Sequence, residues 1–409
     1  MSESRRWDAV VIGGGPAGST AAALLAGSGF GVLVLEKEHF PRFHIGESLL
    51  PAAVLAQQLL GLAPNRDVFA FKRGAQFVDE VGGRVACFDF AEALPGPPRH
   101  AYHVERPRFD ALLLERAAEL GAVVRQGVRV RTVEWSDQQV LVRSDAGLER
   151  ARYVIDATGQ DRLLARQAQA IEPYRHFGKA ASFMHFEGIP AATVEEFGPG
   201  NDIRVMMIAQ GWAWVIPLPN QRLSVGVVSR EPGIAQDDVL HYVESSPLLS
   251  RWTRGAARSQ RRLIGNFSYR NTRSYGSRYA CIGDSACFID PVFSSGVSLA
   301  MLGAQELVRR LAPALHAGTE SDPDLNRADA SQMQRAYETF AALVYRFYNT
   351  RFVDNFLMRA PADGELRASV TSVLAGDVLR PDNPFRDMLL ASRKNPARQP
   401  GAEKMAGEC

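Results

Sequence analysis

Residues 8–36 of the 409-residue chain read DAVVIGGGPAGSTAAALLAGSGFGVLVLE. This stretch opens with an apolar, β-branched run over residues 8–12 and closes with a second such run over residues 31–35. Between them, a glycine-rich turn at 13–18 leads into an alanine- and leucine-rich segment at 19–26. This order favours a strand, a tight turn, a helix and a second strand, and so predicts one unit of a Rossmann-like sheet.

The glycines of the turn have the G-x-G-x-x-G spacing, and an acidic residue follows the second strand. In this motif the first glycine permits the turn, the second lets a pyrophosphate approach the backbone, and the third allows close packing of helix on sheet. The helix N-terminus offers N–H groups to the phosphates. The motif predicts a bound dinucleotide and does not distinguish FAD from NAD. The predicted contacts at this end are Gly13, Gly15, Pro16, Ala17, Gly18, Glu36 and Lys37.

Further pieces of the same sheet are expected much later in the chain. Residues 153–157 are predicted to form a buried strand, and residues 277–282 end a further strand-like stretch that leads into Gly283-Asp284. Strand-like segments between them indicate an inserted unit. The predicted fold class is α/β, a Rossmann-like FAD-binding domain with an inserted, mostly antiparallel β-sheet substrate domain and a helical C-terminal segment. The expected bounds are 1–320 for the first domain, with its inserted sheet at about 66–100 and 175–275, then 321–391 for the helical segment and 392–409 for a flexible tail.

Several local elements can be predicted in more detail. Ser48 is expected to cap a helix that continues to Leu60, with Pro51 in its first turn. Residues 122–143 alternate as antiparallel strands do. Helical periodicity predicts long helices over 296–315 and 329–347.

Composition narrows the functional classes. The chain has 46% hydrophobic residues, enough to fold, and 47 Lys+Arg against 45 Asp+Glu argue against a dedicated nucleic-acid binder. No apolar run is long enough for a membrane helix, and no targeting segment is recognised. The cysteines have neither C-x-x-C nor zinc spacing, so we expect no metal site, small buried thiols with one exposed terminal thiol, and a cytoplasmic location. They are Cys87, Cys281, Cys287 and Cys409.

Three separated motifs resemble the FAD-binding motifs of the para-hydroxybenzoate hydroxylase-like flavoenzymes. They are Arg106-Pro107-Arg108-Phe109-Asp110, Asp156-Ala157-Thr158-Gly159 and Gly283-Asp284. The resemblance covers roughly the first 310 residues and implies FAD as the dinucleotide. It also implies that Asp284 contacts the ribityl chain and that Arg106 lies near the pyrophosphate and the flavin. The remaining residues predicted to bind FAD are Ser48, Val128, Gly159, Pro291, Gly296 and Val297.

Four further stretches are similar to segments of FADH2-dependent halogenases. Residues 211–217, GWAWVIP, match their W-x-W-x-I-P motif, and residues 71–77, FKRGAQF, resemble the segment with their catalytic lysine. Residues 290–297, DPVFSSGV, resemble their flavin- and halide-proximal loop, and residues 43–51 resemble a flavin-flanking segment. The resemblance implies a halogenase that uses FADH2, O2 and chloride or bromide to make hypohalous acid, which Lys72 relays to an electron-rich aromatic substrate.

Each catalytic assignment has a competing structural interpretation. Trp212 and Trp214, two residues apart on a strand, project to one face and can separate flavin from substrate, or they are core residues. Lys72 follows the apolar residues 68–71, where desolvation lowers a lysine pKa, or it is a surface lysine lying on apolar neighbours. Backbone N–H groups at Ser295 and Gly296 can bind halide, which is compatible with an ordinary serine-capped helix start.

One departure from the family pattern bears on the substrate. Tryptophan halogenases carry a glutamate near the lysine in the halide loop, and Phe293 takes that position here. The departure points toward phenols or pyrroles, free or attached to a carrier protein. Aromatic residues near 350 either line the substrate side or pack a helix on the main domain.

Partners and alternatives follow from the single dinucleotide motif. A separate flavin reductase is expected to supply FADH2, and neither nucleic acid nor membrane is expected as a partner. An FAD-dependent aromatic hydroxylase of the same fold, using NADPH directly, is the main alternative. A geranylgeranyl-reductase-like enzyme, whose relatives carry aromatic residues at similar spacing, and a non-catalytic FAD-binding sensor are the others.

Overall fold

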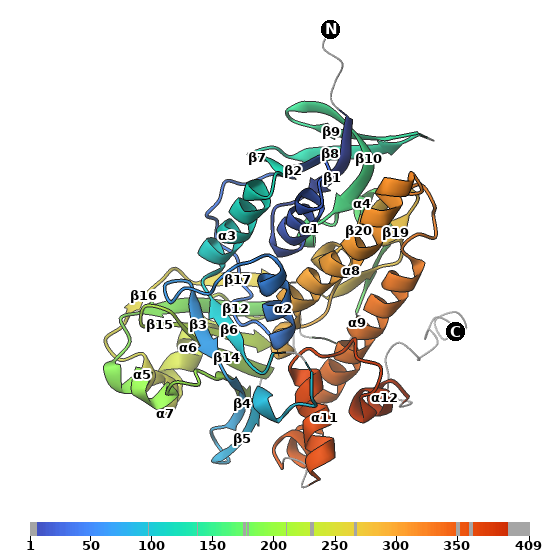
Figure 1. The fold of residues 1–409 in the computed structure, drawn as a ribbon. Coiled ribbons are helices and arrows are strands. Elements are labelled where there is room, and N and C mark those ends of the chain that lie inside the picture. The colour runs from blue at the N-terminus through green and yellow to red at the C-terminus, as the bar shows by residue number, and fades with distance from the viewer. Residues whose placement is uncertain are drawn as a thin grey trace, which may run out of the picture.

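The computed structural model describes most of residues 6–391, and the predicted tail at 392–409 lies outside the described residues. Figure 1 shows one sheet close to the N-terminus and a second sheet at the other end of the molecule, with α8 between them. The positions within 6–391 that are not described are 97, 137, 175–176, 178–179, 210, 230–232, 266–267, 349–351 and 360–362.

The first sheet is Rossmann-like. Its strands follow the order β19-β20-β10-β1-β2-β7, and the five from β20 to β7 are parallel. The hairpin β8–β9 extends it by pairing β9 with the outer half of β10. The bounds are β1 Arg6–Ile12, β2 Val32–Glu36, β7 Val123–Gln126, β8 Val130–Trp135, β9 Val140–Ser144, β10 Gly147–Asp156, β19 Tyr275–Gly276 and β20 Tyr279–Cys281.

Both faces of this sheet are covered, as expected for a parallel sheet. On one face Ala9 and Val11 pack against α1 (Pro16–Gly27), α3 (Arg106–Glu119) and α8 (Ser295–Ala317). On the other face Val10 and Ile12 pack under the β8–β9 hairpin and α4 (Leu163–Gln167). The carboxyl ends of β1, β2, β10 and β20 therefore meet at one edge, where the predicted motifs lie.

The second sheet has the order β16-β12-β15-β14-β13-β4-β5, with β17 also paired to β12, and its one parallel contact is β4 with β13. One face packs on α5 (Ala191–Phe197), α6 (Asp238–Ser245) and α7 (Pro247–Trp252). The other carries both predicted tryptophans. The bounds are β4 Gly74–Asp79, β5 Arg84–Asp89, β12 Ala180–Glu187, β13 Ile203–Ile208, β14 Gly211–Leu218, β15 Arg222–Ser229, β16 Ala257–Arg258 and β17 Arg262–Gly265.

Shorter elements and the C-terminal helices close the space between the two sheets. A two-stranded ladder pairs β3 with β6, and a small sheet contains β11, β18 and β21. α9, α11 and α12 pack on the tryptophan-bearing side of the second sheet. The bounds are β3 Phe69–Lys72, β6 Ala101–Val104, β11 Ile171–Pro173, β18 Tyr269–Asn271, β21 Cys287–Phe288, α2 Pro51–Leu59, α9 Arg327–Phe347, α11 Gly364–Leu374 and α12 Pro384–Ala391.

The predicted fold class is confirmed, and three local predictions are wrong. Residues 123–126 pair in parallel with β2 and not in an antiparallel hairpin. The prediction failed because all four side chains are half-buried, so the sequence pattern does not indicate which strand they pair with. α2 begins at Pro51 with Leu50 before it and without a side-chain cap, so Ser48 is not the cap. Cys87 is exposed, since it alternates with the buried Phe88 on β5, while Cys409 lies outside the described residues.

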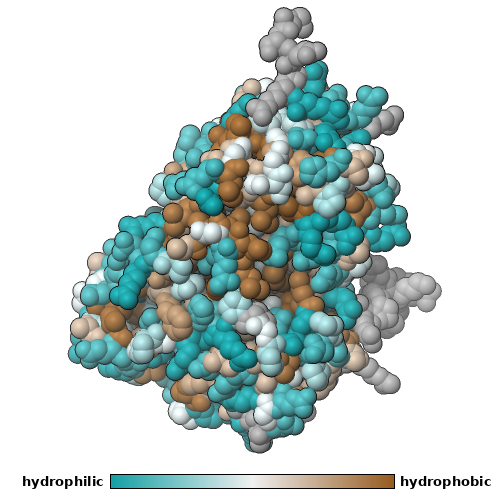
Figure 2. Space-filling model, in the orientation of Figure 1, coloured by the Kyte–Doolittle hydropathy of each residue, from teal (hydrophilic) through white to brown (hydrophobic). Residues whose placement is uncertain are grey.

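The described surface offers few other functional features. No helix in the described ranges has the length and apolarity that a bilayer crossing requires. The same residues contain no cluster of three side chains able to hold a metal ion. Figure 2 shows apolar side chains gathered over the region where α1, α2 and α3 lie in Figure 1, and Leu55 and Leu59 of α2 are exposed there.

Candidate active site

A cavity of about 640 Å³ extends from the carboxyl edge of the parallel sheet to the tryptophan face of the second sheet. Its wall contains every residue predicted to bind the cofactor except Gly18, together with Ser295, Trp212 and Trp214. Its volume lies in the range of small-molecule sites. The predicted site residues are thus brought together from eight separate parts of the chain.

The glycine turn shapes one end of this cavity. Gly13 has a φ of +103°, and a Cβ there would lie 2.3 Å from the carbonyl oxygen of Ala157. A Cβ on Gly18 would lie 1.9 Å from the Gly13 carbonyl oxygen, so Gly18 supports packing rather than lining the cavity. At Gly15 a Cβ would meet only the tip of Arg42, at 3.5 Å. Gly15 therefore leaves open space in front of the α1 N-terminus.

Two acidic strand ends organise the loops around the turn. Glu36 accepts hydrogen bonds from the backbone N–H groups of Gly14, at 2.6 Å, and Glu38, at 2.9 Å. Asp156, at the end of β10, accepts from the backbone and hydroxyl of Thr158 and so shapes the turn to Gly159. Glu36 still lines the cavity, where its carboxylate can accept further hydrogen bonds from a ligand.

A charged cluster lies beside the glycine turn. Arg106 makes a two-pronged contact with Asp110 at 2.8 and 2.9 Å, and Arg42 contacts the same carboxylate at 3.1 Å. Arg106 also donates to the carbonyl of Ile45 at 2.6 Å. One buried carboxylate thus holds two guanidinium groups at the cavity wall. Glu38 also pairs with Arg42 at 3.1 Å, and the two guanidinium groups offer N–H donors where a pyrophosphate would lie, close to Gly15.

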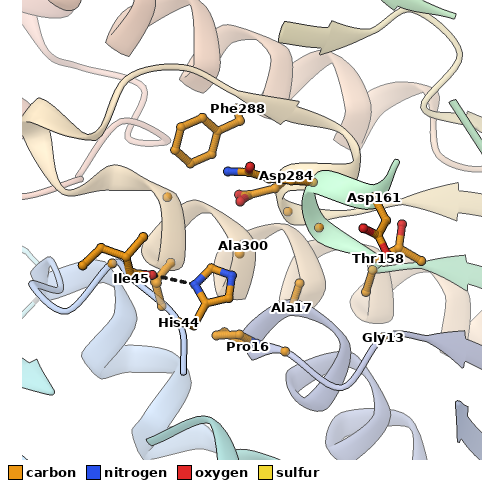
Figure 3. Close-up of a pocket in the computed structure, with 18 of the residues that line it drawn as sticks. Gly13, Pro16, Ala17, His44, Ile45, Thr158, Asp161, Asp284, Phe288 and Ala300 are labelled. Atoms are coloured by element: carbon orange, nitrogen blue, oxygen red, sulfur yellow. Dashed lines mark hydrogen bonds between the residues drawn. The ribbon is translucent and has the colours of Figure 1, made fainter. Parts of the chain in front are cut away.

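Asp284 and His44 face the middle of the cavity from opposite sides. Figure 3 shows Asp284 and Phe288 on one side and His44, Pro16 and Ala17 on the other. Burial raises the pKa of Asp284 to about 6, and Arg106 opposes this shift. Burial, aided by Arg106, lowers the pKa of His44 to about 4. His44 is therefore neutral at pH 7, with Nδ1 donating to the Ile45 carbonyl and Nε2 able to accept.

These features fit FAD. The N-terminus of α1 has no side-chain cap and no acid in its first turn, so its N–H groups can receive a pyrophosphate. Arg106 and Arg42 supply positive charge beside it, and Glu36 lies at the adenosine end expected from the motif. Asp284, Pro291 and the Gly296 backbone border the opposite end. The redox-active ring would lie there.

The paired tryptophans form a wall at that opposite end. Trp212 and Trp214 lie on the same face of β14, with ring centroids 5.9 Å apart, and both border the cavity. The Trp214 indole donates to Ser224 at 3.1 Å and lies across Gly226, where a Cβ would be 2.2 Å from the ring. Both side chains are buried, so each tryptophan is a core residue and also part of the cavity wall.

Lys72 is buried, which excludes the surface-lysine interpretation. Its side chain is 1% exposed, and its ammonium donates to Ser48 Oγ and the Leu49 carbonyl oxygen, both at 2.8 Å. Burial lowers the pKa of Lys72 to about 7, against the opposing charge of Asp202. Among the described residues that line the cavity, Lys72 is absent and Ser48 is present.

The loop predicted to bind halide has a different cap from the one expected. Ser294 has a φ of +56° and precedes α8 without capping it through its side chain. Asp290 instead accepts from the Val292 backbone N–H and caps the short turn over Pro291–Phe293. Phe293 points into the aromatic core, with its ring centroid 5.6 Å from that of Phe347. The position that holds a carboxylate in tryptophan halogenases is therefore apolar here.

Three contacts at the site were not predicted from the sequence. His185 on β12 donates to Glu47 at 2.7 Å, and Tyr348 donates to Asp290 at 2.7 Å. His103 on β6 is buried beside Lys72. Glu47 lay in a recognised segment, but its partner is 138 residues away, and short-range periodicity cannot find such a pair.

The fold and the cavity are those of an FAD-dependent oxidoreductase, with the cavity lying between a Rossmann-like sheet and a mostly antiparallel second sheet. The tryptophan halogenase family model matches residues 8–97 and 91–374. The chain is 33% identical over 362 residues to a tryptophan 2-halogenase of Chondromyces crocatus, which covers 83% of this chain and 67% of that protein.

Two further relatives resemble nearly the whole chain. A 1H-pyrrole-2-carbonyl-[peptidyl-carrier protein] chlorinase of Pseudomonas fluorescens is 31% identical over 407 residues, covering 91% of this chain and 89% of that protein. The solved structure of the flavin-dependent brominase Bmp2 superposes with a TM-score of 0.82 at 26% identity, covering 94% of this chain and 97% of Bmp2. The chain therefore belongs to the tryptophan halogenase family. It is a flavin-dependent halogenase, with FAD as cofactor and halide as co-substrate.

Proposed function

We propose that this enzyme halogenates a phenol or a pyrrole, with Lys72 relaying hypohalous acid from the flavin side of the cavity to the substrate. The observation that carries the proposal is the position of Lys72. Its amine is buried, and it is hydrogen-bonded to Ser48 in the wall that also holds Trp212 and Trp214. A buried lysine with its pKa lowered to about 7 is available as both an amine and an ammonium near neutral pH.

We assign each residue of the cavity a separate role in the halogenation. Reduced FAD, when bound, supplies the reduction of O2 that with halide yields hypohalous acid. The Ser295 and Gly296 backbone holds the halide. Trp212 and Trp214 keep the organic substrate away from the ring, so oxygen is not passed to it directly. Lys72 presents the halogen electrophile to the activated ring carbon.

The substrate class rests on Phe293. The family resemblance implies that tryptophan halogenases carry a glutamate near the lysine in this loop, whereas Phe293 occupies that position here and packs against Phe347. Phenols and pyrroles are electron-rich and need less assistance in losing the ring proton. The pyrrole chlorinase named above acts on a carrier-bound ring, which supports testing a carrier-bound substrate as well as free ones.

A separate flavin reductase is proposed as the source of reduced FAD. The chain carries a single dinucleotide motif, and the cavity described above accommodates FAD at that motif. An aromatic hydroxylase of the same fold would instead oxidise NADPH itself.

The decisive experiment supplies FADH2 through an added reductase, with O2 and either chloride or bromide. Three substrates are offered, a free phenol, a free pyrrole and a pyrrole-2-carbonyl group on a peptidyl-carrier protein. We expect a product with a halogen isotope pattern from at least one of them. Lys72→Ala is expected to abolish halogenation while FADH2 oxidation continues at the wild-type rate. The control Arg143→Ala, at an exposed position on β9, is expected to behave as wild type.

Two outcomes would overturn the proposal. NADPH oxidation by the protein alone, with a product heavier by one oxygen atom, would identify a hydroxylase. Halogenation that survives in Lys72→Ala would show that the electrophile reaches the substrate without the lysine.

A further inference from the structure

Lys72 and the cavity are connected through a single side chain. Lys72 is 1% exposed, and the group that joins its ammonium to the cavity wall is the Ser48 hydroxyl, 2.8 Å away. The Leu49 carbonyl, also at 2.8 Å, fixes the ammonium from the same segment. A molecule in the cavity therefore meets Ser48 before it meets the lysine.

The rest of the lysine's surroundings cannot replace Ser48. The Phe90 ring centroid lies 5.2 Å from Nζ and offers only its face. Asp202 acts on Lys72 at longer range and is itself bonded to Arg73 and Gln76. No other described side chain hydrogen-bonds to the ammonium.

His103 is the remaining titratable group beside Lys72. It is fully buried, its Nε2 donates to the Asn201 carbonyl, and its Nδ1 has no partner among the described residues. Burial and the charge of Lys72 keep the pKa of His103 well below its ordinary value. His103 and Ser48 face each other across an antiparallel bridge. His103 is thus neutral, and it cannot accept the lysine's proton permanently at pH 7.

We propose that the Ser48 hydroxyl is the proton relay between Lys72 and hypohalous acid in the cavity. This inference rests on the proposed role of Lys72 and assigns Ser48 a function in the transfer of halogen. In this arrangement Lys72 acts on the oxidant through the Ser48 hydroxyl, which accepts a hydrogen bond from the ammonium and donates its own proton to the oxidant.

The relay balances the halogenation step. The π-electrons of the aromatic carbon bond to the halogen, the O–X bond breaks, and its electron pair stays on oxygen. The Ser48 hydroxyl gives its proton to that oxygen, which leaves as water, while the Lys72 ammonium restores the hydroxyl proton. The ring carbon then loses its proton, which returns through Ser48 to the Lys72 amine. The sum is ArH plus HOX giving ArX plus H2O.

This cycle gives the lysine both proton roles. It is the acid as the O–X bond breaks and the base as the ring recovers its aromaticity. A lysine pKa of about 7 suits both directions near neutral pH. The relay would therefore explain how the site works with Phe293 in place of a glutamate.

The test compares Ser48→Ala with Ser48→Thr, which keeps the hydroxyl, and Ser298→Ala. Ser298 accepts from the Leu50 backbone N–H at 3.1 Å and so supports the same segment without touching Lys72. The chain contains five lysines, so the Lys72 signal can be followed in FAD-loaded protein with 13Cε-labelled lysine. Its assignment comes from the spectrum of Lys72→Met.

We expect Ser48→Ala to lower the Lys72 pKa by about one unit, because the charged form loses a hydrogen-bond acceptor. Measured with saturating FAD, halogenation per FADH2 oxidised should fall about 100-fold, with hypohalous acid released to a β-diketone trap. Ser48→Thr should restore both the pKa and the yield, and Ser298→Ala should change neither.

The possible failures are distinguishable. An unchanged Lys72 pKa and yield in Ser48→Ala, with Lys72→Ala inactive, would overturn the relay and leave the role of Lys72 standing. Weakened FAD binding with an unchanged Lys72 pKa would make Ser48 a cofactor contact and also overturn the relay. If Ser48→Ala does not fold, Ser48→Gly, which also lacks the hydroxyl, is used. Full activity with an unshifted Lys72 pKa in that variant would contradict the relay.

Discussion

Tyr348, directly after α9, donates its hydroxyl to Asp290 Oδ2 at 2.7 Å and so ties the C-terminal helices to the loop that borders the flavin site. Asp290 also caps the turn over Pro291–Phe293. The indole N–H of Trp212 donates in turn to the Tyr348 hydroxyl at 3.3 Å. One hydroxyl therefore connects the indole wall, the C-terminal segment and the predicted halide loop.

Tyr348→Phe is expected to lower the free energy of unfolding by about 1–3 kcal/mol, because a buried carboxylate loses a charge-assisted hydrogen bond. The looser loop should also raise the KM for halide more than it lowers kcat. Urea denaturation and halide titrations measure the two effects. Tyr279→Phe, which removes a weak exposed contact of 3.4 Å, is the control and should be neutral. An unchanged KM for halide would show that the Tyr348–Asp290 hydrogen bond does not affect halide binding, and would contradict the prediction.

Two glycines of the turn are expected to affect different properties, Gly18 the stability of the fold and Gly15 the binding of FAD. Gly18→Ala places a Cβ 1.9 Å from a backbone oxygen, so α1 must move, and we expect a loss of about 2–4 kcal/mol in stability. Gly15→Ala meets only the end of a flexible arginine at 3.5 Å, so stability should be unchanged. Its methyl group should nevertheless weaken FAD binding about 10- to 100-fold, because it occupies the approach to the α1 N-terminus. Thermal unfolding without flavin and FAD titration measure the two quantities, and a stable Gly18→Ala would contradict the packing argument.

Much of this site could be predicted because its parts are local motifs. Gly13, Glu36 and Asp284 each follow a strand, and the carboxyl ends of parallel strands share one edge, so their proximity follows from topology. The tryptophans share a face because side chains alternate along a strand. The depth of Lys72 did not follow from its neighbours, since Phe71 beside it is exposed and the burial comes from segments 24 and 31 residues away.

The unpredicted contacts all join distant segments. His185 reaches Glu47 from the second sheet, and Tyr348 reaches Asp290 from the last helices. No periodicity encodes such a pair, because each partner has a locally ordinary position. Ser48 was predicted to cap α2 because serine is a common helix cap. In the structure its hydroxyl accepts a hydrogen bond from Lys72 instead.

Gly226 provides the space that Trp214 occupies. Gly226→Ala places a methyl group 2.2 Å from the indole, which also contacts the rings of Trp212 and Phe183. The ring should move into the cavity, with a loss of about 1–3 kcal/mol, a changed tryptophan fluorescence spectrum and a lower halogenation yield per FADH2 oxidised.

A double-mutant cycle tests whether Trp214 is the cause. Adding Trp214→Phe, with its smaller ring, should recover most of the stability lost in Gly226→Ala. Gly364→Ala, where a Cβ would meet nothing within 4 Å, is the control and should not destabilise. If the second substitution recovers nothing, the clash lies elsewhere.

Lys72→Met is expected to inactivate the enzyme and stabilise the fold. The lysine pKa falls from its ordinary value of 10.5 to about 7 on folding, so between these values the unfolded chain binds more protons than the native protein. The penalty for burying Lys72 is therefore full below pH 7 and disappears as the pH rises through 10.5. At pH 7 the gain from Met should be roughly 2–4 kcal/mol, after the loss of two hydrogen bonds.

Urea denaturation at pH 7 and pH 10 should show this gain shrinking or reversing with pH, whereas the exposed control Arg309→Met should show no such trend. A pH-independent effect would mean that Lys72 keeps its charge in the native protein, and its use as an amine would then fail.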